Sequence, residues 1–317
     1  MKAVRIHSFG GPDVLQVEDI PKPKPREGEV LIRVHAASVN PVDYKIRSHE
    51  FALPGMKPPL VLGRDVSGVV EGVGRGVTRV KMGDEVYALL DPDHGGYAEY
   101  TIAKENGVAL KPSTLDHIHA AAVPLAAITA WQGLFDHGKL KAGERVLIHG
   151  AGGGVGHFAV QFARERDAYV IATGRAEDRD LLEGLGADEI FDTTERFEAQ
   201  LRDIDLVLDL VAGETQQRSW SVLKKGGRLV STLKPPTAAE ASRHQAQAIG
   251  FMAEPNRDEL AEIARLIDDG KVKVVVRQVM PLADARHAHE YMEREHVLGK
   301  VVLVVDSEIP TETAAPV

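Results

Sequence analysis

The apolar positions of the chain follow two different patterns, and the first covers Met1 to about Lys111. Short runs rich in β-branched residues alternate there with glycine and proline; these runs are Val30–Val34, Val66–Val70, Glu85–Leu89 and Ala98–Ile102. Runs of this length between turn residues are typical of strands. The pattern therefore predicts an antiparallel, barrel-like domain with little helix.

From His117 onward the pattern predicts strands that alternate with helices. A long apolar helix is expected over Ala120–Phe135, and a second over about Val155–Arg166. The expected strands are Arg145–His149, Ala168–Thr173, Glu189–Asp192, Leu206–Leu210, Arg228–Leu233 and Ile249–Ala253. Buried strands that alternate with helices indicate an α/β fold with a doubly wound parallel sheet.

The last part of the chain returns to the first pattern. Helices are expected at Asp258–Ile267 and around Asp284–Arg294, followed by a strand at Lys300–Val305. We expect a β-rich domain over residues 1–122, a parallel-sheet domain over 123–267, a segment over 268–305 that returns to the first domain, and a disordered polar tail over 306–317.

Charge and hydropathy exclude several classes of partner. The 317 residues carry a formal net charge of −9, with acidic and basic residues interspersed, so neither nucleic acid nor an anionic membrane is an expected partner. No stretch is apolar for long enough to span a bilayer, and Met1–Phe9 lacks the apolar core of a signal peptide. We therefore expect a cytoplasmic protein.

The chain has no cysteine, which excludes disulfides and thiolate metal sites. The 13 histidines show no spacing that places metal ligands on one face. His94, between Asp91 and Asp93, is interpreted as part of a solvated polar loop. No metal site is predicted.

The strongest local motif is a glycine-rich turn that joins the strand Arg145–His149 to the following helix. A dinucleotide pyrophosphate needs a turn without obstructing Cβ atoms and the free amides of a helix N-terminus. Gly150, Gly153 and Gly156 recur every third residue, which differs from the common Gly-x-Gly-x-x-Gly spacing, but the strand before and the helix after favour nucleotide binding. The candidate contacts are Gly150, Gly152, Gly153, Gly154, Val155 and Gly156.

The end of the next strand predicts which dinucleotide is bound. NAD sites usually place an acidic residue there for the ribose 2′-hydroxyl, whereas this chain has Thr173, Gly174 and Arg175. Arg175 suits a 2′-phosphate, with Arg179 as a weaker second candidate. The alternative is that Arg175 is a solvated residue at a helix start. We predict NADPH as the cofactor, with Val211 and Leu233 as further candidate contacts.

Several motifs resemble the medium-chain dehydrogenase/reductase superfamily, and within it the zinc-independent quinone oxidoreductase and alkenal/enone reductase branch. The resemblance covers nearly the whole chain. It rests on Ala37–Asp43, Pro59–Val70, Gly83–Val86, Gly96–Tyr100, the turn at Gly150 and Gly299–Val302, in this order. It implies a GroES-like catalytic domain followed by a Rossmann domain.

The same resemblance bears on the metal. Zinc alcohol dehydrogenases of this superfamily carry a cysteine where this chain has Asn40, a Gly-His-Glu where it has Gly63-Arg64-Asp65, and a four-cysteine lobe where it has the loop Leu90–Gly95. Without cysteines both zinc sites are lost, and with them the Lewis acid that alcohol oxidation needs. Hydride transfer from NADPH to a quinone or an α,β-unsaturated carbonyl compound is the expected reaction.

The resemblance also implies catalytic residues. Asn40 would lie beside the nicotinamide and the substrate and donate its amide to an oxyanion, and its alternative role is to cap the helix that begins at Pro41. Tyr44 and Lys45 are candidate proton donors, although relatives carry the tyrosine one position later. Thr129 would approach the nicotinamide, and its alternative is a hydrogen bond to its own helix backbone. Asp43 and Asp65 are interpreted as structural.

Two other function classes stay open. An enoyl-thioester reductase would share the fold and the hydride step, and a non-enzymatic NADPH-binding or sensor protein would share the cofactor site. The resemblance further suggests a homodimer through the sheet edge around Ile249–Ala253. The physiological acceptor is not evident from the residues.

Overall fold

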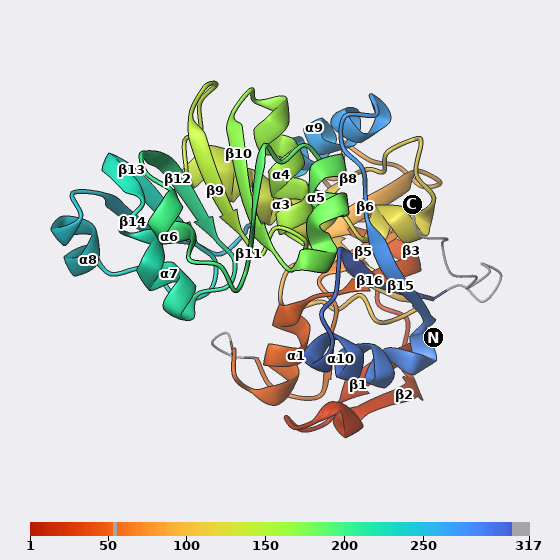
Figure 1. The fold of residues 1–317 in the computed structure, drawn as a ribbon. Helices are drawn as coiled ribbons and strands as arrows, with labels where there is room; N and C mark the ends of the chain where they lie inside the picture. The colour runs from red at the N-terminus through yellow and green to blue at the C-terminus, as the bar shows by residue number, and fades with distance from the viewer. Residues whose placement is uncertain (53–55, 306–317) are drawn as a thin grey trace. The chain divides into compact units, whose positions relative to one another are not determined.

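The structure, a computed structural model, describes residues 1–52 and 56–305, and the chain divides into two units. Unit 1 contains Met1–Leu125, Pro255–Asp269 and the chain from Val274 onward, whereas unit 2 contains Ala126–Glu254 and Gly270–Lys273 (Figure 1). The tail expected to be disordered, 306–317, lies outside the described residues. No helix among the described residues is long and apolar enough to cross a membrane.

Unit 1 is built on sheets around the long strand β3 (Glu29–Val39), in which neighbouring strands run antiparallel except for the parallel pair of β15 and β16. The larger sheet has the order β15-β16-β3-β5-β6-β8, and β7 pairs with β3 off this path. A smaller sheet has the order β2-β1-β4. The other strands are β1 (Lys2–Ile6), β2 (Leu15–Asp19), β4 (Leu60–Val61), β5 (Asp65–Val73), β6 (Glu85–Leu89), β7 (Tyr100–Lys104), β8 (Val108–Leu110), β15 (Val276–Pro281) and β16 (Lys300–Val304). The antiparallel strand arrangement predicted for the first part of the chain is confirmed.

The β-branched runs of the sequence supply the core of unit 1. Val30, Ile32 and Val34 alternate along β3 and are buried in one cluster with residues of β5, β6 and β16. The last strand, β16, pairs antiparallel with β3, with Val301 opposite Val39. The C-terminal segment thereby brings Lys300 to the end of β3 where α1 begins.

The helices of unit 1 are α1 (Pro41–Ser48), α2 (His117–Ala121), α9 (Arg257–Asp268) and α10 (Ala285–Arg294), with the short 3₁₀ turns η1 (Pro12–Val14), η2 (Glu105–Gly107) and η5 (Leu282–Asp284). Of these, α2 packs against β3 and β5, α9 against β8, and α10 against β16. Tyr87 donates from its hydroxyl to the Leu260 carbonyl at 2.5 Å, and Asp268 accepts from the Ser113 and Thr114 amides at 3.1 and 3.0 Å. These bonds hold α9 in unit 1, whereas the sequence placed Asp258–Ile267 in the parallel-sheet domain.

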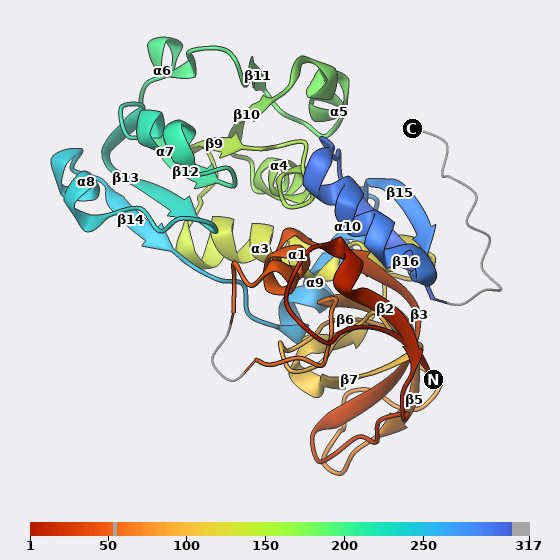
Figure 2. The same ribbon diagram turned by 90° about the horizontal axis from the view of Figure 1, so that it is seen from below.

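Unit 2 is a six-stranded parallel sheet with the order β11-β10-β9-β12-β13-β14. Its strands are β9 (Arg145–His149), β10 (Tyr169–Gly174), β11 (Glu189–Asp192), β12 (Ile204–Asp209), β13 (Leu223–Ser231) and β14 (Gln247–Gly250). Numbered from β9, this is the order 3-2-1-4-5-6 of a Rossmann domain. Figure 2 shows α3 on one side of these strands and α7 on the other. The predicted doubly wound sheet is confirmed.

The helices of unit 2 follow its strands, as the alternating pattern predicts. They are α3 (Pro124–Trp131), which begins in unit 1, α4 (Gly156–Glu165), α5 (Arg179–Gly184), α6 (Phe197–Gln200), α7 (Gly213–Ser219) and α8 (Ala238–Arg243), with the 3₁₀ turn η4 (Ala176–Asp178). The single helix expected over Ala120–Phe135 is wrong in detail. Two helices stand in its place: α2 ends before Pro124 and α3 begins at Pro124, because proline fits the first turn of a helix but cannot continue a preceding one. A π-helical segment, η3 (Gln132–His137), follows Trp131.

Candidate active site

Asp65, the first residue of β5, is the centre of a buried polar cluster in unit 1. Its side chain is fully buried and accepts hydrogen bonds from Ser38 Oγ at 2.7 Å and Asn40 Nδ2 at 2.8 Å. Its other oxygen accepts from the backbone amide of Leu125 at 2.7 Å. Three donors from separate segments therefore fix this carboxylate, and the interpretation of Asp65 as structural agrees with these contacts.

Lys300 completes the cluster from β16. It is buried, its ammonium donates to Asn40 Oδ1, and it lies 3.4 Å from the Val39 carbonyl oxygen and 3.6 Å from Asp65 Oδ2. Burial lowers the pKa of Lys300, while the nearby Asp65 and Asp43 carboxylates oppose that shift. The ammonium is thus surrounded by acceptor oxygens, which keep a buried charge tolerable.

Asn40 occupies the N-cap position of α1, and its side chain joins the buried cluster. Its amide oxygen accepts from Lys300 and its Nδ2 donates one hydrogen to Asp65. The reciprocal bond of the helix start is made by the Asn40 backbone amide, which donates to Asp43 Oδ2 at 2.8 Å. The second Nδ2 hydrogen has no acceptor among the residues that the structure describes, so it is available to a ligand.

A second buried chain of polar groups runs from Asp43. Tyr97 donates from its hydroxyl to Asp43 Oδ2 at 3.1 Å and lies 3.2 Å from His289 Nε2, while Arg47 Nη1 lies 3.1 Å from His289 Nδ1. Because arginine only donates, His289 Nδ1 accepts and Nε2 carries the hydrogen. Arg47 also donates to Glu293 at 2.8 Å.

Burial shifts the pKa values along this chain in opposite directions. It raises the pKa of Asp43 to about 6, which the Asn40 amide bond opposes, and raises the pKa of Tyr97 as well. It lowers the pKa of His289 to about 3, and the Arg47 charge adds to that effect. At neutral pH the Asp43 carboxyl group is therefore close to its titration range, and His289 is neutral.

The structure does not bring the remaining catalytic candidates into the cluster. Tyr44 and Lys45 follow on α1 with half-buried side chains, and neither has a hydrogen bond to Asp65, Lys300 or Asn40. Burial, with the charges of Glu293 and Glu50, raises the pKa of Tyr44, so it keeps its proton at neutral pH. Thr129 is buried in α3 of unit 2.

The glycine turn of unit 2 has the shape that the sequence predicts. Gly150 adopts a φ of +69°, and a Cβ on Gly156 would lie 2.3 Å from the Gly150 carbonyl oxygen. Gly153 donates its amide to the same oxygen at 3.1 Å, which closes the turn. Within the described residues, nothing accepts from the amides of Gly152, Gly154 or Val155. Three free N–H groups therefore precede α4, a surface that suits an anionic group.

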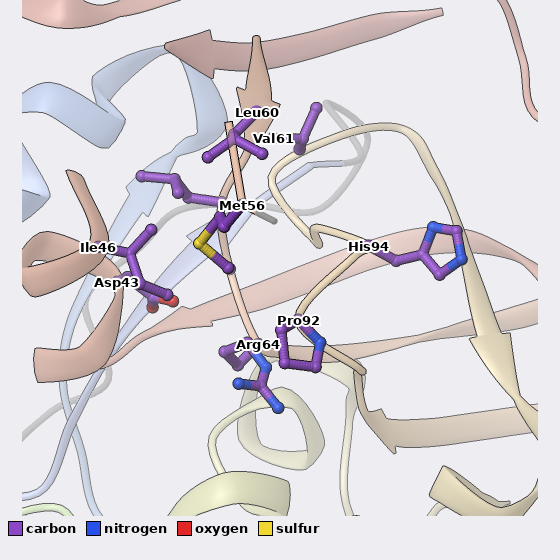
Figure 3. A pocket seen from close by; sticks show the side chains of 10 residues that line it. Asp43, Ile46, Met56, Leu60, Val61, Arg64, Pro92 and His94 are labelled. Atoms are coloured by element: carbon purple, nitrogen blue, oxygen red, sulfur yellow. The ribbon is translucent and has the colours of Figure 1, made fainter. Parts of the chain in front are cut away.

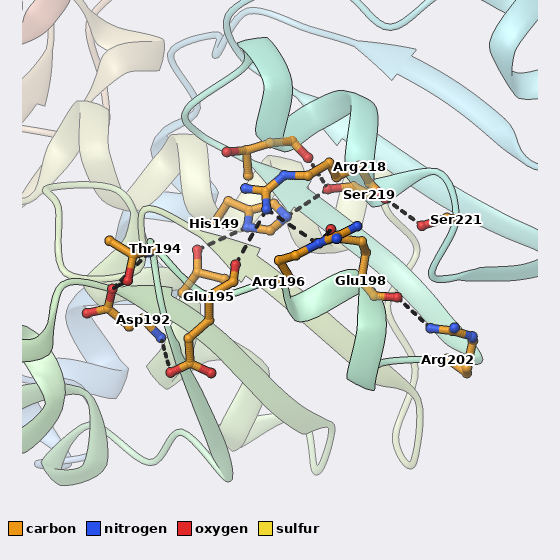
Figure 4. A network of polar contacts seen from close by, with 12 residues as sticks. His149, Asp192, Thr194, Glu195, Arg196, Glu198, Arg202, Arg218, Ser219 and Ser221 are labelled. Atoms are coloured by element: carbon orange, nitrogen blue, oxygen red, sulfur yellow. Dashed lines mark hydrogen bonds and ion pairs between the residues drawn. The ribbon is translucent and has the colours of Figure 1, made fainter.

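Thr173 and Gly174 are the last two residues of β10. His149 lies between two hydroxyls, with Nδ1 3.0 Å from Thr173 Oγ1 and Nε2 2.8 Å from Ser219 Oγ (Figure 4). Ser219 donates to the Thr215 carbonyl oxygen, so His149 donates to Ser219 and Thr173 donates to His149. The hydroxyl hydrogen of Thr173 is used in its contact with His149, so toward a ligand its Oγ1 can only accept a hydrogen bond.

Arg175 and Arg179 present their side chains to solvent. The Arg175 side chain is 54% exposed with Nη1 3.7 Å from Glu177, and the Arg179 side chain is 47% exposed with Nη1 3.7 Å from Glu183. Arg179 also donates weakly to the Ile190 carbonyl oxygen at 3.3 Å. Ion pairs of this length on a surface are weak, so both guanidinium groups are accessible to an anion.

Val211 and Leu233 are exposed apolar residues at the carboxyl ends of two adjacent strands. They are 46% and 43% exposed. The buried carboxylate of Asp209 shapes both loops, since it accepts from the Val211 amide at 3.1 Å and from Ser231 Oγ at 2.9 Å, and Ser231 Oγ accepts from the Leu233 amide at 3.4 Å. Gln216 Nε2 donates to Asp209 at 2.8 Å. Such exposed apolar side chains suit the flat face of a bound ring.

Comparisons with known proteins agree with this geometry. The family described as Alcohol dehydrogenase GroES-like domain matches residues 26–113, and that described as Zinc-binding dehydrogenase matches residues 185–303. The rat protein named quinone oxidoreductase is 33% identical over 96% of this chain and 98% of its own length. The chain belongs to the quinone oxidoreductase branch of the medium-chain dehydrogenase/reductase superfamily.

Two further relatives of this quinone oxidoreductase branch are informative. The Arabidopsis thaliana protein named NADPH-dependent alkenal/one oxidoreductase is 36% identical, covering 96% of this chain and 79% of that protein. The Escherichia coli quinone oxidoreductase, solved in complex with NADPH, has a TM-score of 0.86 and 28% identity over 96% of this chain and 100% of that chain.

Reasoning from the sequence missed several buried polar residues of this family member. Lys300 lies in the motif Gly299–Val302, but nothing in the local sequence indicates that its side chain contacts Asn40. Tyr97, Arg47 and His289 were not singled out either. Asp209 had a usable signal, because an acidic residue that ends a buried parallel strand lies at the edge of the sheet where ligands bind.

Proposed function

We propose that this protein is an NADPH-dependent reductase that transfers hydride to a quinone or an α,β-unsaturated carbonyl compound without zinc. The observation that carries the proposal is the glycine turn of unit 2, with its three free amides, in a chain whose relatives are named quinone oxidoreductase and NADPH-dependent alkenal/one oxidoreductase. NADPH, when bound, supplies the hydride.

The residues of unit 2 fit this cofactor. The amides of Gly152, Gly154 and Val155 would hold the pyrophosphate, and no side chain at the turn would block it. Arg175 would bind the 2′-phosphate, with Arg179 as the second cation, and Val211 and Leu233 would contact the rings. Thr129 is the proposed contact on the nicotinamide side. The unshared amide groups and the exposed guanidinium are the features that support this assignment.

Residues of unit 1 do not fit a catalytic zinc ion. The acceptor oxygens of Asn40 and Asp65 are already used by the Lys300 ammonium, and Arg64 adds a second positive charge next to Asp65. A divalent cation would be repelled by both charges, and no thiolate is present to offset them. These contacts support a reaction that proceeds without a metal.

The polar cluster would then act by fixing Asn40. Lys300 and Asp65 hold the two ends of its amide, and the second Nδ2 hydrogen is free to donate to the oxygen on which negative charge develops. Tyr44 is the proposed proton donor, because it keeps its proton at neutral pH, and Lys45 is the alternative. The edge strand β14 supports a homodimer through this edge.

The test is NADPH consumption with 1,4-benzoquinone, a short alkenal and an enoyl thioester, each measured before and after dialysis against a strong chelator. We expect turnover with the quinone and the alkenal, unchanged by the chelator. Turnover with the thioester alone would make the protein an enoyl-thioester reductase. NADPH binding without any turnover would make it a binding protein, and activity that chelation removes and zinc restores would contradict the metal-free reaction.

A further inference from the structure

Arg64 is a buried cation whose hydrogen-bonding capacity is mostly unused. It follows Gly63, whose φ of +94° and contact with the Tyr97 ring leave no room for a side chain. Arg64 is only 8% exposed, and its single hydrogen bond runs from Nε to the Leu90 carbonyl oxygen at 2.7 Å. Among the described residues, none accepts from its two terminal amino groups. Burial lowers the pKa of this guanidinium, which is the expected penalty for a charge without a close partner.

Asp43 provides a second unpartnered group in the same cavity. The cavity has a volume of about 10 Å³, and its lining includes Arg64, Asp43, Met56, Pro92 and His94 (Figure 3). Asp43 is fully buried; its Oδ2 has two donors, whereas its Oδ1 has no hydrogen bond within the described part of the chain. A space of this volume holds about one oxygen-sized group. The structure thus places Arg64, with its unused donors, and Asp43, with its unused acceptor, in the lining of a cavity for a single oxygen atom.

The comparison with Lys300 shows why Arg64 is the cation to consider. Lys300 is surrounded by the Asn40, Asp65 and Val39 oxygens, so its charge is used inside the protein. Arg64 has only the Leu90 carbonyl and keeps a planar pair of amino groups free, the geometry that binds an anionic oxygen best. Within the described ranges, the fully buried atom of this cavity without a partner is Asp43 Oδ1, and such atoms are rare in folded proteins and need an explanation.

We propose that Arg64 binds the carbonyl oxygen of the electron acceptor and stabilises the negative charge that develops there. The proposal rests on the proposed function. Hydride adds to the acceptor carbon, NADPH is oxidised to NADP⁺, and the electron pair of the reduced double bond moves through the conjugated system onto the oxygen. An enolate or hydroquinone anion results, and a proton from the donor proposed above, Tyr44 or Lys45, completes the product. A fixed guanidinium then supplies the charge stabilisation that zinc relatives obtain from a metal.

The first arm of the test uses 4-nitrophenol, a phenol whose anion resembles the charged product and is followed by its absorbance. A donor to the oxyanion lowers the pKa of the bound phenol, so the wild-type protein should bind the phenolate at least tenfold more tightly than the Arg64→Gln variant. Arg75→Gln is the matched control, because Arg75 lies on the surface of the same unit and pairs with Glu27. Its phenolate affinity should equal that of the wild type.

The second arm measures turnover with 1,4-benzoquinone at saturating NADPH. R64Q should reduce kcat by about 10- to 100-fold while the Kd for NADPH stays within twofold, since Arg64 belongs to unit 1. Unchanged phenolate affinity and unchanged kcat in R64Q would overturn the proposal and leave Arg64 as a partner of Leu90 and of one water molecule. Absence of turnover in the wild type would instead overturn the proposed function, while the phenolate arm still tests Arg64.

Asp43→Asn provides the measurement if R64Q does not fold. An asparagine keeps an oxygen for the Asn40 amide and for Tyr97, but it removes a negative charge from the cavity that Arg64 lines. The other groups that face Asp43 are Asp65, Lys300 and Arg64, and none of them is changed by the variant. D43N should bind the phenolate severalfold more tightly at pH 8. An affinity equal to that of the wild type would overturn the placement of the oxygen in this cavity.

Discussion

Asp65 in unit 1 and Asp209 in unit 2 are both fully buried carboxylates, but their partners come from different distances along the chain. Asp209 accepts from Val211, Gln216 and Ser231, which are 2, 7 and 22 positions away. Asp65 accepts from Ser38, which is 27 positions away, and from Leu125, which is 60 away. Its counter-charge, Lys300, comes from the last strand of the chain.

The two carboxylates have different roles because their partners differ. Asp209 receives only neutral donors from two neighbouring strand ends, so it shapes the loops that carry Val211 and Leu233. Asp65 shares a buried ammonium with Asn40, so it balances that charge and fixes the orientation of the Asn40 amide proposed for catalysis. We therefore expect removal of a buried charge to lower the unfolding free energy most in unit 1. In unit 2 we expect the loss of Asp209 to act through the loops that carry Val211 and Leu233.

The largest expected effect follows Lys300→Met. The variant removes a buried cation, leaves Asp65 charged without compensation and takes the donor from Asn40 Oδ1. Breaking a buried pair in this way costs about 3–5 kcal/mol of unfolding free energy, measured by urea denaturation. Lys22→Met, which removes an exposed pair with Glu71, is the control and should leave stability close to that of the wild type.

A double variant sharpens this first prediction. Asp65→Asn combined with Lys300→Met removes both charges and should recover part of the loss, because a neutral buried pair needs no counter-charge. If K300M were no more destabilising than K22M, the contrast between the two carboxylates would fail.

A smaller effect is expected from Asp209→Asn. One of the two acceptor oxygens becomes an amide nitrogen, so it no longer accepts from its donors, for a loss of about 1–3 kcal/mol in unfolding free energy. Since the loops of Val211 and Leu233 lose their anchor, NADPH affinity measured by fluorescence should fall severalfold. Asp167→Asn, in an exposed turn of the same unit, should leave the affinity unchanged. Lower stability with unchanged affinity would make Asp209 purely structural.

The buried chain of unit 1 predicts a dependence of stability on pH. His289 has a pKa lowered to about 3, against about 6.5 in the unfolded chain, so it stabilises the fold fully above pH 6.5 and loses that contribution as the pH falls. Asp43 has a pKa raised to about 6, so its contribution is largest below pH 4 and is lost as the pH rises to 6. Between pH 4 and 6, the two groups therefore change the unfolding free energy with pH in opposite directions.

Single variants separate these two slopes. His289→Gln should make the unfolding free energy fall less steeply with acid, by up to about 1.4 kcal/mol per pH unit, and Asp43→Asn should make it fall more steeply by a similar amount. Urea denaturation at pH 4, 5, 6 and 7 provides the comparison. Equal slopes in both variants and the wild type would show that neither group titrates as assigned.

The smallest effect is expected at the exposed cations of unit 2. Arg175→Ser should lower the affinity for NADPH by about tenfold or less, because a half-exposed guanidinium interacts with a phosphate in a medium of high dielectric constant. The affinity for NADH should stay within twofold of the wild-type value. Arg179→Ser should change NADPH affinity less. An equal loss for both cofactors in R175S would contradict the assignment of Arg175 to the 2′-phosphate.

The architecture and the glycine turn of this quinone oxidoreductase relative follow from local patterns of the sequence. The β-branched runs of unit 1 and the alternating strands of unit 2 are local patterns, and burial of their apolar faces leaves few other arrangements. The turn from Gly150 to Gly156 is also local, because its shape depends on glycines that are neighbours in the chain. Boundaries were less well predicted, as the break before Pro124 shows.

Which polar groups find hydrogen-bond partners depends on the tertiary fold. Thr173 gives its hydroxyl hydrogen to His149, and α9, which the sequence predicts in the parallel-sheet domain, is bound to unit 1 by Tyr87 and Asp268. Lys300 meets Asn40 across 260 positions, and among the described residues Arg64 has one acceptor, the Leu90 carbonyl oxygen, which bonds to Nε and leaves the two terminal amino groups without one. Hydrogen bonds act over about 3 Å, so partners and unpaired groups depend on which distant segments the fold brings together, a property that no local pattern contains.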